Sequence, residues 1–323
     1  MNIKGISVWG IGNHAYKRII PAILKIKELN LIGICSRSHS KIESLVAELS
    51  CKGWTNCKVM FQDNEIDVVM ISTPIGMHFD HAKTALEHKK NVWCEKPLSN
   101  NFNHTKILIE LAKKNKKMLS EAFMFLYHPQ FIKIQNIVNN KEYGKVHSII
   151  CRFGIPKLKE PGFRENVKLG GGAFWDVGSY TVAAALAIFE DQDVEILFSE
   201  LIKDKKTLLD YQGRAILRFS QGTIAYLEWG VGVAYKNEID LWAEKGSFYT
   251  DKIFSKPNKY IPVYRMRNKY GEEEIISGKN DEQFESMFKV FSKILNSPLK
   301  IENEYKRIYK RAKVMDEIFN FSQ

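Results

Sequence analysis

Gly10-Ile11-Gly12-Asn13-His14-Ala15 joins an apolar run, Ile3–Trp9, to a helical pattern, and it is the stretch that decides the predicted fold. Gly10 permits a tight turn, Gly12 lets the backbone approach a pyrophosphate, and Ala15 allows a helix to pack closely on a strand. The N-terminus of that helix favours an anion. A purely structural glycine turn is the alternative, but its place after the first strand of an alternating series favours a dinucleotide site. We assign cofactor contacts to Gly10, Gly12, Asn13, His14 and Ala15.

The rest of the first 122 residues alternates between strand-like and helical segments. Asp67–Ser72 has an apolar, largely β-branched centre, as a parallel strand buried on both faces requires. Strands that alternate with short helices predict right-handed crossovers and a doubly wound parallel sheet. The further strands expected are Leu29–Cys35, Asn91–Cys94 and Lys117–Ala122, and the helices are Lys41–Leu49, Phe79–His88 and Asn103–Asn115.

The pattern changes after Glu121. A helix is expected over Ala173–Phe189, and the strand-like segments that follow it, linked by short turns, predict an antiparallel sheet. We expect two domains: residues 1–122 for the dinucleotide, and residues 123–323 for substrate binding and oligomerisation. No linker separates them, so we expect them to share a tight interface. The expected strands are Val194–Ile202, Gly213–Phe219, Thr223–Trp229, Glu238–Ala243, Ser247–Thr250 and Tyr260–Arg267, and the closing helices are Asp281–Leu295 and Glu302–Phe321.

The end of the second predicted strand distinguishes NAD from NADP. An acidic residue there would bond the ribose 2′-hydroxyl group of NAD. This chain has Cys35-Ser36-Arg37-Ser38 instead, without a carboxylate that would repel a 2′-phosphate. Arg37 can bind that phosphate and stack on adenine, and Ser36 can donate a hydrogen bond. A solvated loop arginine is the alternative for Arg37, but we expect NADP(H) to be preferred over NAD(H).

The composition is that of an ordinary globular protein. The 323 residues are 45% hydrophobic and 26% charged, and no apolar run is long enough to span a membrane. The net charge of +11 is spread along the chain, so we expect no nucleic-acid partner. The five cysteines form no C-x-x-C pair, and His78 and His81 lack a third ligand, so we expect neither a disulfide framework nor a metal. No apolar signal core precedes the glycine turn, and we expect a cytoplasmic location.

Further motifs occur in a fixed order along the chain. Thr73-Pro74-x-x-x-His78 follows one buried strand, and Glu95-Lys96-Pro97 follows the next. Gly170-Gly171-Gly172-Ala173-Phe174-Trp175-Asp176-Val177-Gly178-Ser179-Tyr180 opens the helix of the second half. Together with Glu121-Ala122-Phe123-Met124 and His128-Pro129, this set resembles the Gfo/Idh/MocA family of NAD(P)-dependent sugar and polyol oxidoreductases, over nearly the whole chain.

The resemblance implies an N-terminal Rossmann domain and a C-terminal α/β domain with an open, mostly antiparallel sheet, one face of which commonly packs against a partner subunit. It implies a substrate between the domains, a cis Lys96–Pro97 bond, and Glu121 near the nicotinamide ribose. Tyr180 stands where many relatives carry His, but family members of the sugar-ketoreductase and dihydrodiol-dehydrogenase type also carry Tyr there. The further expected cofactor-binding residues are Ser36, Arg37, Ser72, Thr73, Pro74, His78, Glu95, Lys96, Pro97 and Glu121.

Reduction of a carbonyl group by hydride requires a proton donor and positive charge at the developing alkoxide. Tyr180 is the expected donor, because a phenol with a pKa of about 10 holds its proton at neutral pH. Lys96 is the expected cation, since a nearby ammonium group lowers that pKa. Asp176 precedes Tyr180 by one helical turn, so both can face one substrate, with Asp176 at a neighbouring hydroxyl group. A core tyrosine and a surface lysine are the alternatives.

Other polar residues are less specific. Tyr127, His128 and Arg164 could line the substrate pocket, whereas Arg152, in a predicted strand, is more typical of a structural residue. His78 is more typical of a helix cap or loop than of a catalyst.

The expected function is hydride transfer between nicotinamide and a sugar carbonyl or hydroxyl group, with a nucleotide-linked keto-sugar as the expected substrate. The alternatives are an aldose or cyclic-diol dehydrogenase, and a non-catalytic sensor that kept the fold. The presence of Lys96, Asp176 and Tyr180 together counts against the sensor. Because Ile224, Tyr226 and Trp229 give the second-half sheet apolar surface that few helices can cover, we expect a homodimer or homotetramer.

Overall fold

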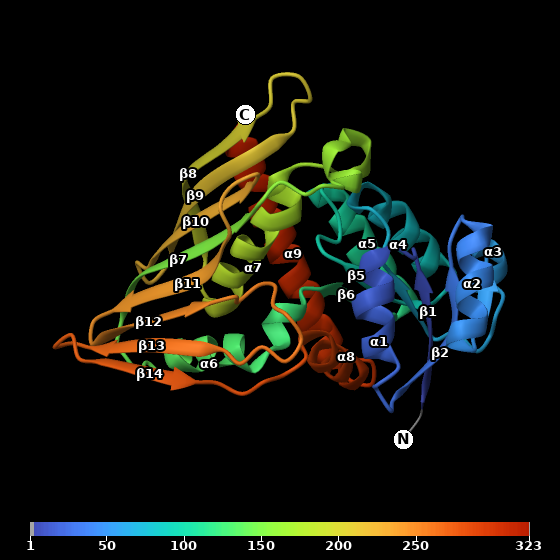
Figure 1. The fold of residues 1–323 in the computed structure, drawn as a ribbon, viewed down its shortest axis with the longest axis horizontal. Helices are drawn as coiled ribbons and strands as arrows, with labels where there is room; N and C mark the ends of the chain where they lie inside the picture. Colours follow the sequence, from blue (N-terminus) through green and yellow to red (C-terminus); the bar gives the residue numbers. More distant parts are fainter. Residues whose placement is uncertain (1–2, 323) are drawn as a thin grey trace. The chain divides into compact units, whose positions relative to one another are not determined.

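A parallel sheet of six strands forms the first unit of the computed structural model, which describes residues 3–322 (Figure 1). The strand order is β3-β2-β1-β4-β5-β6, so the winding reverses between β1 and β4. The doubly wound sheet predicted from the sequence is thereby confirmed, and ligands of such sheets bind beyond the carboxyl ends of the strands at this reversal. The strands are β1 (Lys4–Trp9), β2 (Leu29–Cys35), β3 (Lys52–Trp54), β4 (Val68–Ile71), β5 (Asn91–Glu95) and β6 (Leu119–Ala122).

Helices alternate with these strands. The glycine turn leads into a π-helical turn, Ala15–Ile19, which continues as α1. Val69, Val92 and Leu108 are fully buried in the core between sheet and helices. The helices are α1 (Ile20–Ile23), α2 (His39–Leu49), α3 (Cys57–Phe61), α4 (His78–Glu87) and α5 (Phe102–Asn115), of which α3, like strand β3, was not predicted.

The C-terminal segment Phe284–Lys310 belongs to the first unit, although the sequence assigned every residue after 122 to the second domain. In α8 (Gln283–Ile294), the rings of Phe288 and Phe291 pack against the buried Trp93 of β5, with centroids 5.7 and 5.3 Å apart. The second unit comprises Phe123–Gln283 and the residues from Arg311 onward. Helix α9 (Pro298–Phe321) starts in the first unit, and two of its residues complete the core there: Tyr305 and Ile308.

An eight-stranded sheet forms the second unit, in the order β14-β13-β12-β11-β7-β10-β9-β8. Neighbouring strands run antiparallel except β7 and β10, so the expected mostly antiparallel sheet is confirmed. The strands are β7 (Val146–Ile155), β8 (Val194–Lys203), β9 (Asp210–Phe219), β10 (Ile224–Val231), β11 (Lys236–Ala243), β12 (Gly246–Asp251), β13 (Val263–Asn268) and β14 (Glu273–Ser277). Helix α6 (Pro129–Asn139) and strand β14 were not predicted.

Helix α7 (Ser179–Ile188) lies on one face of this sheet, against β7 and β10 (Figure 1). A π-helical turn, Phe174–Gly178, leads into it. The indole of Trp229 packs closely under this turn. A side chain at Gly178 would come within 3.0 Å of the indole, and one at Gly213 within 2.4 Å, so both positions require glycine. Trp229 is 4% exposed. The expected grouping of Trp229 with Ile224 and Tyr226 is therefore wrong, since Trp229 faces the helix and an odd spacing places it on the opposite side of the strand.

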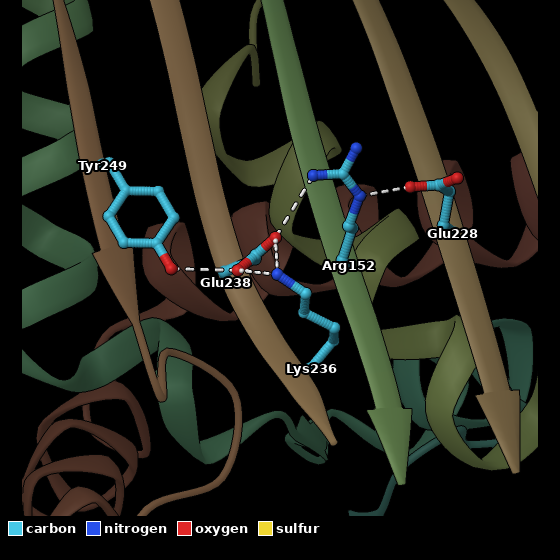
Figure 2. Close-up of polar contacts among 5 residues, drawn as sticks. All are labelled: Arg152, Glu228, Lys236, Glu238 and Tyr249. Carbon is cyan, nitrogen blue, oxygen red and sulfur yellow. Dashed lines mark hydrogen bonds and ion pairs between the residues drawn. The ribbon is translucent and has the colours of Figure 1, made fainter. Parts of the chain in front are cut away.

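The other face of the sheet carries a row of alternating charges on five strands. Strand register places five side chains next to one another in this order: Glu200, Arg214, Glu228, Arg152 and Glu238. Figure 2 shows the centre of the row, where Arg152 contacts Glu228 and, at 3.2 Å, the buried Glu238. Glu238 also accepts from Lys236 at 3.1 Å and from Tyr249 at 2.9 Å. An apolar row lies beside it: Phe198, Ile216, Tyr226 and Ile150.

Across residues 3–322, no helix combines the length and the apolar character needed to cross a membrane.

Candidate active site

The glycine turn forms the first part of the candidate site. Gly10 has a φ of +100°, and a side chain there would come within 2.8 Å of the Ser72 carbonyl group and 2.6 Å of Thr73. Its amide donates to the Cys35 carbonyl at 2.9 Å, so the turn is held between the ends of β2 and β4. A side chain at Gly12, in contrast, would meet no atom within 4 Å. The exposed backbone at Gly12 thus leaves the space that a pyrophosphate requires.

Ser36 and Arg37 follow β2 at the same edge of the sheet. The Ser36 amide donates to the Trp54 carbonyl at 3.0 Å, which fixes the backbone of this loop on β3. The Ser38 hydroxyl caps α2 by accepting from the Lys41 amide. Arg37 is exposed, and within residues 3–322 its guanidinium has no carboxylate at ion-pair distance. The loop therefore presents a cation that the fold does not use.

His81 of α4 lies at this edge too, although the sequence suggested no more than an ordinary histidine on a helix surface. Its ring stacks on Trp9, with centroids 3.8 Å apart, and its Nδ1 atom is 3.0 Å from the Thr73 hydroxyl. Burial, with smaller contributions from His78 and Arg37, lowers the pKa of His81 to about 4. His81 is consequently a neutral residue at pH 7.

The Lys96–Pro97 segment follows β5, and its peptide bond is cis, as the resemblance implied. Lys96 is 8% exposed. Two buried side chains hold the backbone beyond it: His78 has its Nδ1 atom 2.8 Å from the Pro97 carbonyl, and Glu121 accepts from the Leu98 amide at 2.7 Å. The other ring nitrogen of His78 is 2.7 Å from the Thr73 carbonyl. His78 thus ties together the loops after β4 and β5, and Glu121 ties the loop after β5 to strand β6, in addition to any role toward a cofactor.

Glu95 links the same segment to the glycine turn. Its carboxylate lies 3.2 Å from Nε2 of the exposed His14. Burial raises the pKa of Glu95, but the attraction of His14 and Lys96 outweighs this and lowers it overall. Glu95 is therefore ionised at neutral pH.

In the second unit, Asp176 lies in the π-helical turn and Tyr180 in the first turn of α7. Asp176 accepts from Arg164 Nε at 2.5 Å, so Arg164, which the sequence left unranked, is the ion-pair partner of a predicted catalytic residue. The backbone around Arg164 explains why Gly171, the second residue of the triple glycine, has no side chain. A side chain at Gly171 would come within 2.4 Å of the Arg164 carbonyl oxygen. The same oxygen accepts a hydrogen bond of 3.1 Å from the Gly172 amide.

The Tyr180 ring lies in an aromatic cluster. Its neighbours are Phe123, Phe125, Phe153 and Phe254, at centroid distances between 5.2 and 5.9 Å. The hydroxyl group lies 3.7 Å from the Met124 sulfur atom, a weak acceptor. The cluster holds the ring on several sides and so restricts the direction in which the hydroxyl points.

His128 and Tyr127 lie in the segment that leads into α6. His128 is fully buried, and its Nδ1 atom accepts from the Gln130 amide at 3.0 Å, which caps the helix. Burial and the nearby Lys256 lower the pKa of His128 to about 4. His128 is therefore a neutral cap, whereas Tyr127 is half-buried at the end of a 3-10 turn. Arg152 lies on the exposed face of the sheet, in the charged row.

No group of three or more His, Cys, Asp or Glu side chains in the described part of the chain is arranged to hold a metal ion. Lys96 belongs to the first unit, and Asp176 and Tyr180 belong to the second. Within the first unit, the structure places the glycine turn against Ser72 and Thr73, and Glu95 beside His14. Within the second unit, it places Asp176 beside Arg164.

Comparison with known proteins identifies the family. A model of an oxidoreductase family with an NAD-binding Rossmann fold matches residues 4–123, and a model of the GFO/IDH/MocA C-terminal domain matches residues 131–249. The chain belongs to the GFO/IDH/MocA oxidoreductase family. The resemblance drawn from its motifs is confirmed, and the protein is an oxidoreductase with an NAD(P)-binding Rossmann fold.

The proteins that this chain resembles differ in the substrates that their names give. The chain is 29% identical, over 84% of its length and 81% of the relative, to dTDP-3,4-didehydro-2,6-dideoxy-alpha-D-glucose 3-reductase of Saccharopolyspora spinosa. It is 29% identical, over 65% of its length and 63% of the relative, to trans-1,2-dihydrobenzene-1,2-diol dehydrogenase of Xenopus laevis. The crystal structure of KijD10, a 3-ketoreductase from Actinomadura kijaniata in complex with NADP and TDP-benzene, has the same fold, with a TM-score of 0.93 at 23% identity over 99% of this chain and 98% of that chain.

Proposed function

We propose that this oxidoreductase reduces the carbonyl group of a keto-sugar carried on a nucleoside diphosphate, with NADPH as the hydride source. The observation that carries the proposal is the match over 84% of the chain to a reductase of a dTDP-linked keto-sugar. Three further relatives, each between 25% and 27% identical, bear the same name. The dihydrodiol dehydrogenase of Xenopus laevis matches a smaller share, 65% of the chain.

The preference for NADPH rests on the loop after β2. Arg37 is exposed and has no carboxylate partner in the described residues, so its guanidinium is available to the 2′-phosphate of NADP. Ser36, next to it, can add a hydrogen bond. The exposed backbone at Gly12 and the polar loops after β4 and β5 would hold the remainder of the dinucleotide.

The chemistry proposed for this chain is a protonation coupled to hydride transfer. NADPH, when bound, supplies the hydride. Tyr180 donates the proton to the reacting oxygen, and Lys96 stabilises the phenolate that remains. Asp176, oriented by Arg164, accepts a hydrogen bond from a neighbouring hydroxyl group of the sugar. His78 and Glu121 hold the backbone next to Lys96 and so position its ammonium group.

A rate comparison tests the substrate. NADPH oxidation is measured with a dTDP-linked keto-sugar, with the same keto-sugar lacking the nucleotide, and with dihydrodiols and aldoses in the oxidative direction with NADP. We expect the largest kcat/KM for the dTDP-linked compound. A larger kcat/KM for the free sugar, an aldose or a diol would replace the proposal with the dehydrogenase alternative, and binding without turnover of any compound would favour a sensor.

The oligomeric state is a further proposal: two copies pair through the exposed face of the eight-stranded sheet. The charged side chains of the row on that face already form ion pairs within one chain. A partner copy that covers this face would therefore bury no unpaired charge from the row. The apolar row beside them includes Phe198 and Tyr226, which are 40% and 41% exposed. A cytoplasmic location remains a prediction from the sequence.

Light scattering at micromolar concentration tests the pairing and should give at least twice the chain mass. Arg152→Met should weaken the dimer, because it leaves Glu228 and Glu238 without a shared partner, whereas Lys58→Met, on the first unit, should not. A monomer mass for the wild-type protein would refute this proposal.

A further inference from the structure

The start of the π-helical turn Phe174–Gly178 is bonded to a residue far away in the sequence. The Asp210 carboxylate, at the beginning of β9, accepts a hydrogen bond from the Phe174 amide at 2.6 Å. The first amides of a helix have no partner within it, and a carboxylate satisfies them best because the N-terminus carries partial positive charge. Asp210 therefore caps the helical segment that carries both Asp176 and Tyr180.

The fit of this carboxylate is tight on its other side. Gly172 has a φ of +110°, and a side chain there would come within 2.4 Å of Asp210 Oδ1. The third glycine of the triple-glycine motif is thus required by Asp210, as the second is by the Arg164 backbone. Asp210 is 7% exposed, so water offers little replacement for its bond to Phe174.

A second contact fixes the same turn from below. The Trp229 indole fills the space between Gly178 and Gly213, and its ring lies 5.2 Å from that of Phe174. Packing on an indole fixes the height of the turn above the sheet but leaves rotation about the helix axis open. The bond from Asp210 to a single amide removes that freedom, because it fixes one backbone atom two residues before Asp176.

We propose that Asp210 is a positioning residue for this reaction: it sets the rotation of the helical segment that presents Asp176 and Tyr180. The role rests on the function proposed above, because it acts through two residues assigned there. No contact of Asp210 with substrate or cofactor is required.

The environment of Asp210 gives this role a pH dependence. Burial raises its pKa to about 6, opposed by the Phe174 amide, the Trp229 indole and the charge of Lys203 on β8. Protonation below that pH removes the charge that binds the amide. The kcat of the wild-type enzyme should therefore decrease as pH falls through about 6.

Two variants and a control test the role. Asp210→Ala removes the acceptor and should lower kcat by about 10–100-fold, the scale expected for slight misplacement of reacting groups, with the Kd of NADPH unchanged. Asp210→Asn keeps one acceptor oxygen but, like the protonated acid, carries no charge, so its kcat should stay near the reduced value that the wild type reaches below pH 6, without the decrease near pH 6. Asp204→Ala is the matched control, because Asp204 also accepts backbone hydrogen bonds in this unit but lies exposed in the turn between β8 and β9.

Hydrogen exchange of the peptide covering residues 173–180 separates this proposal from the proposed function, because it needs no substrate. Asp210→Ala should speed exchange of that peptide, and Asp204→Ala should not. Unchanged exchange, or faster exchange with kcat within twofold of wild type, would overturn the positioning role. If Asp210→Ala does not fold, Asp210→Asn decides: a kcat profile identical to that of wild type through pH 6 overturns it. Absence of any reductase activity in the wild-type protein would instead count against the proposed function. The exchange result would still show whether Asp210 caps the helical segment at Phe174.

Discussion

Replacing Arg37 with methionine should change the choice of cofactor without weakening the fold. Arg37 is exposed and makes no ion pair within the described residues, so its removal takes no ion pair from the first unit. One hydrogen bond to a charged group is worth about 1.5–3 kcal/mol, which corresponds to roughly 10–150-fold in Kd. We therefore expect Arg37→Met to weaken NADPH binding by roughly 10–150-fold and NADH binding by less than about twofold, because only NADPH carries the 2′-phosphate.

Calorimetric titration of both cofactors at one ionic strength measures this difference, since binding to a phosphate depends on salt. Lys114→Met is the matched control: it removes one exposed positive charge from the C-terminal end of α5, which leads to the amino end of β6 and so lies at the opposite edge of the sheet from the loop after β2. The melting temperature of each variant shows whether the fold is unchanged. Equal loss of NADPH and NADH affinity in Arg37→Met would show that Arg37 does not contact the 2′-phosphate.

Three further results are expected. Tyr180→Phe and Lys96→Met should each lower kcat by about 10²–10⁴-fold in steady-state assays with little change in NADPH affinity, and the double variant should be scarcely worse than either, because the two residues act on one proton; near wild-type kcat in Tyr180→Phe, with hydride transfer rate-limiting, would point to another acid. Phe288→Ala should cost about 3–5 kcal/mol in denaturant unfolding of the first unit, since its ring is fully buried against Trp93, and a loss below about 1 kcal/mol would contradict the packing of α8 there. Burial lowers the pKa of Lys256 from 10.5 to about 7, so between those pH values the unfolded chain binds a proton that the folded chain lacks, and stability rises with pH; melting temperatures at pH 7.5 and 9.5 should show this rise in wild type and a smaller one in Lys256→Met.

The sequence predicted most of the first unit because its longer elements carry their own signals, whereas the short β3 and α3 do not. The parallel strands are continuous apolar runs, and the glycine turn lies where a tight turn and an open backbone are both needed. Strand β14 was missed because all five of its residues are exposed, so no alternation of apolar and polar residues marks it. The apolar spacing of α8 and α9 indicates buried helices, but it does not say which sheet buries them, and Phe284–Lys310 was therefore assigned to the second domain.

The motifs of the candidate site were visible, but their partners were not. Lys96, Asp176 and Tyr180 stand out by type and position, whereas the bond from Phe174 to Asp210 spans 36 residues and leaves no local pattern. His78 shows the same limit: its motif predicted a site residue, while its contacts with the Thr73 and Pro97 carbonyls depend on how two strand ends meet. The residue types indicate which side chains could take part in the reaction. Which other residues hold those side chains in place can be seen only in the folded structure.

The return of the chain to the first unit through α8 and the start of α9 has a consequence for biosynthesis. The core of that unit includes Tyr305 and Ile308, which the ribosome adds more than 180 residues after Ala122, the last residue of β6. Because chains are synthesised at about 5–20 residues per second, many seconds pass between synthesis of the N-terminal sheet and synthesis of the side chains that complete its core. The whole of the second sheet is translated during that delay, so the two units complete their cores close together in time. A nascent chain halted before α8 would expose Trp93 and its neighbours, and chaperones that bind apolar surface would meet this protein at that stage.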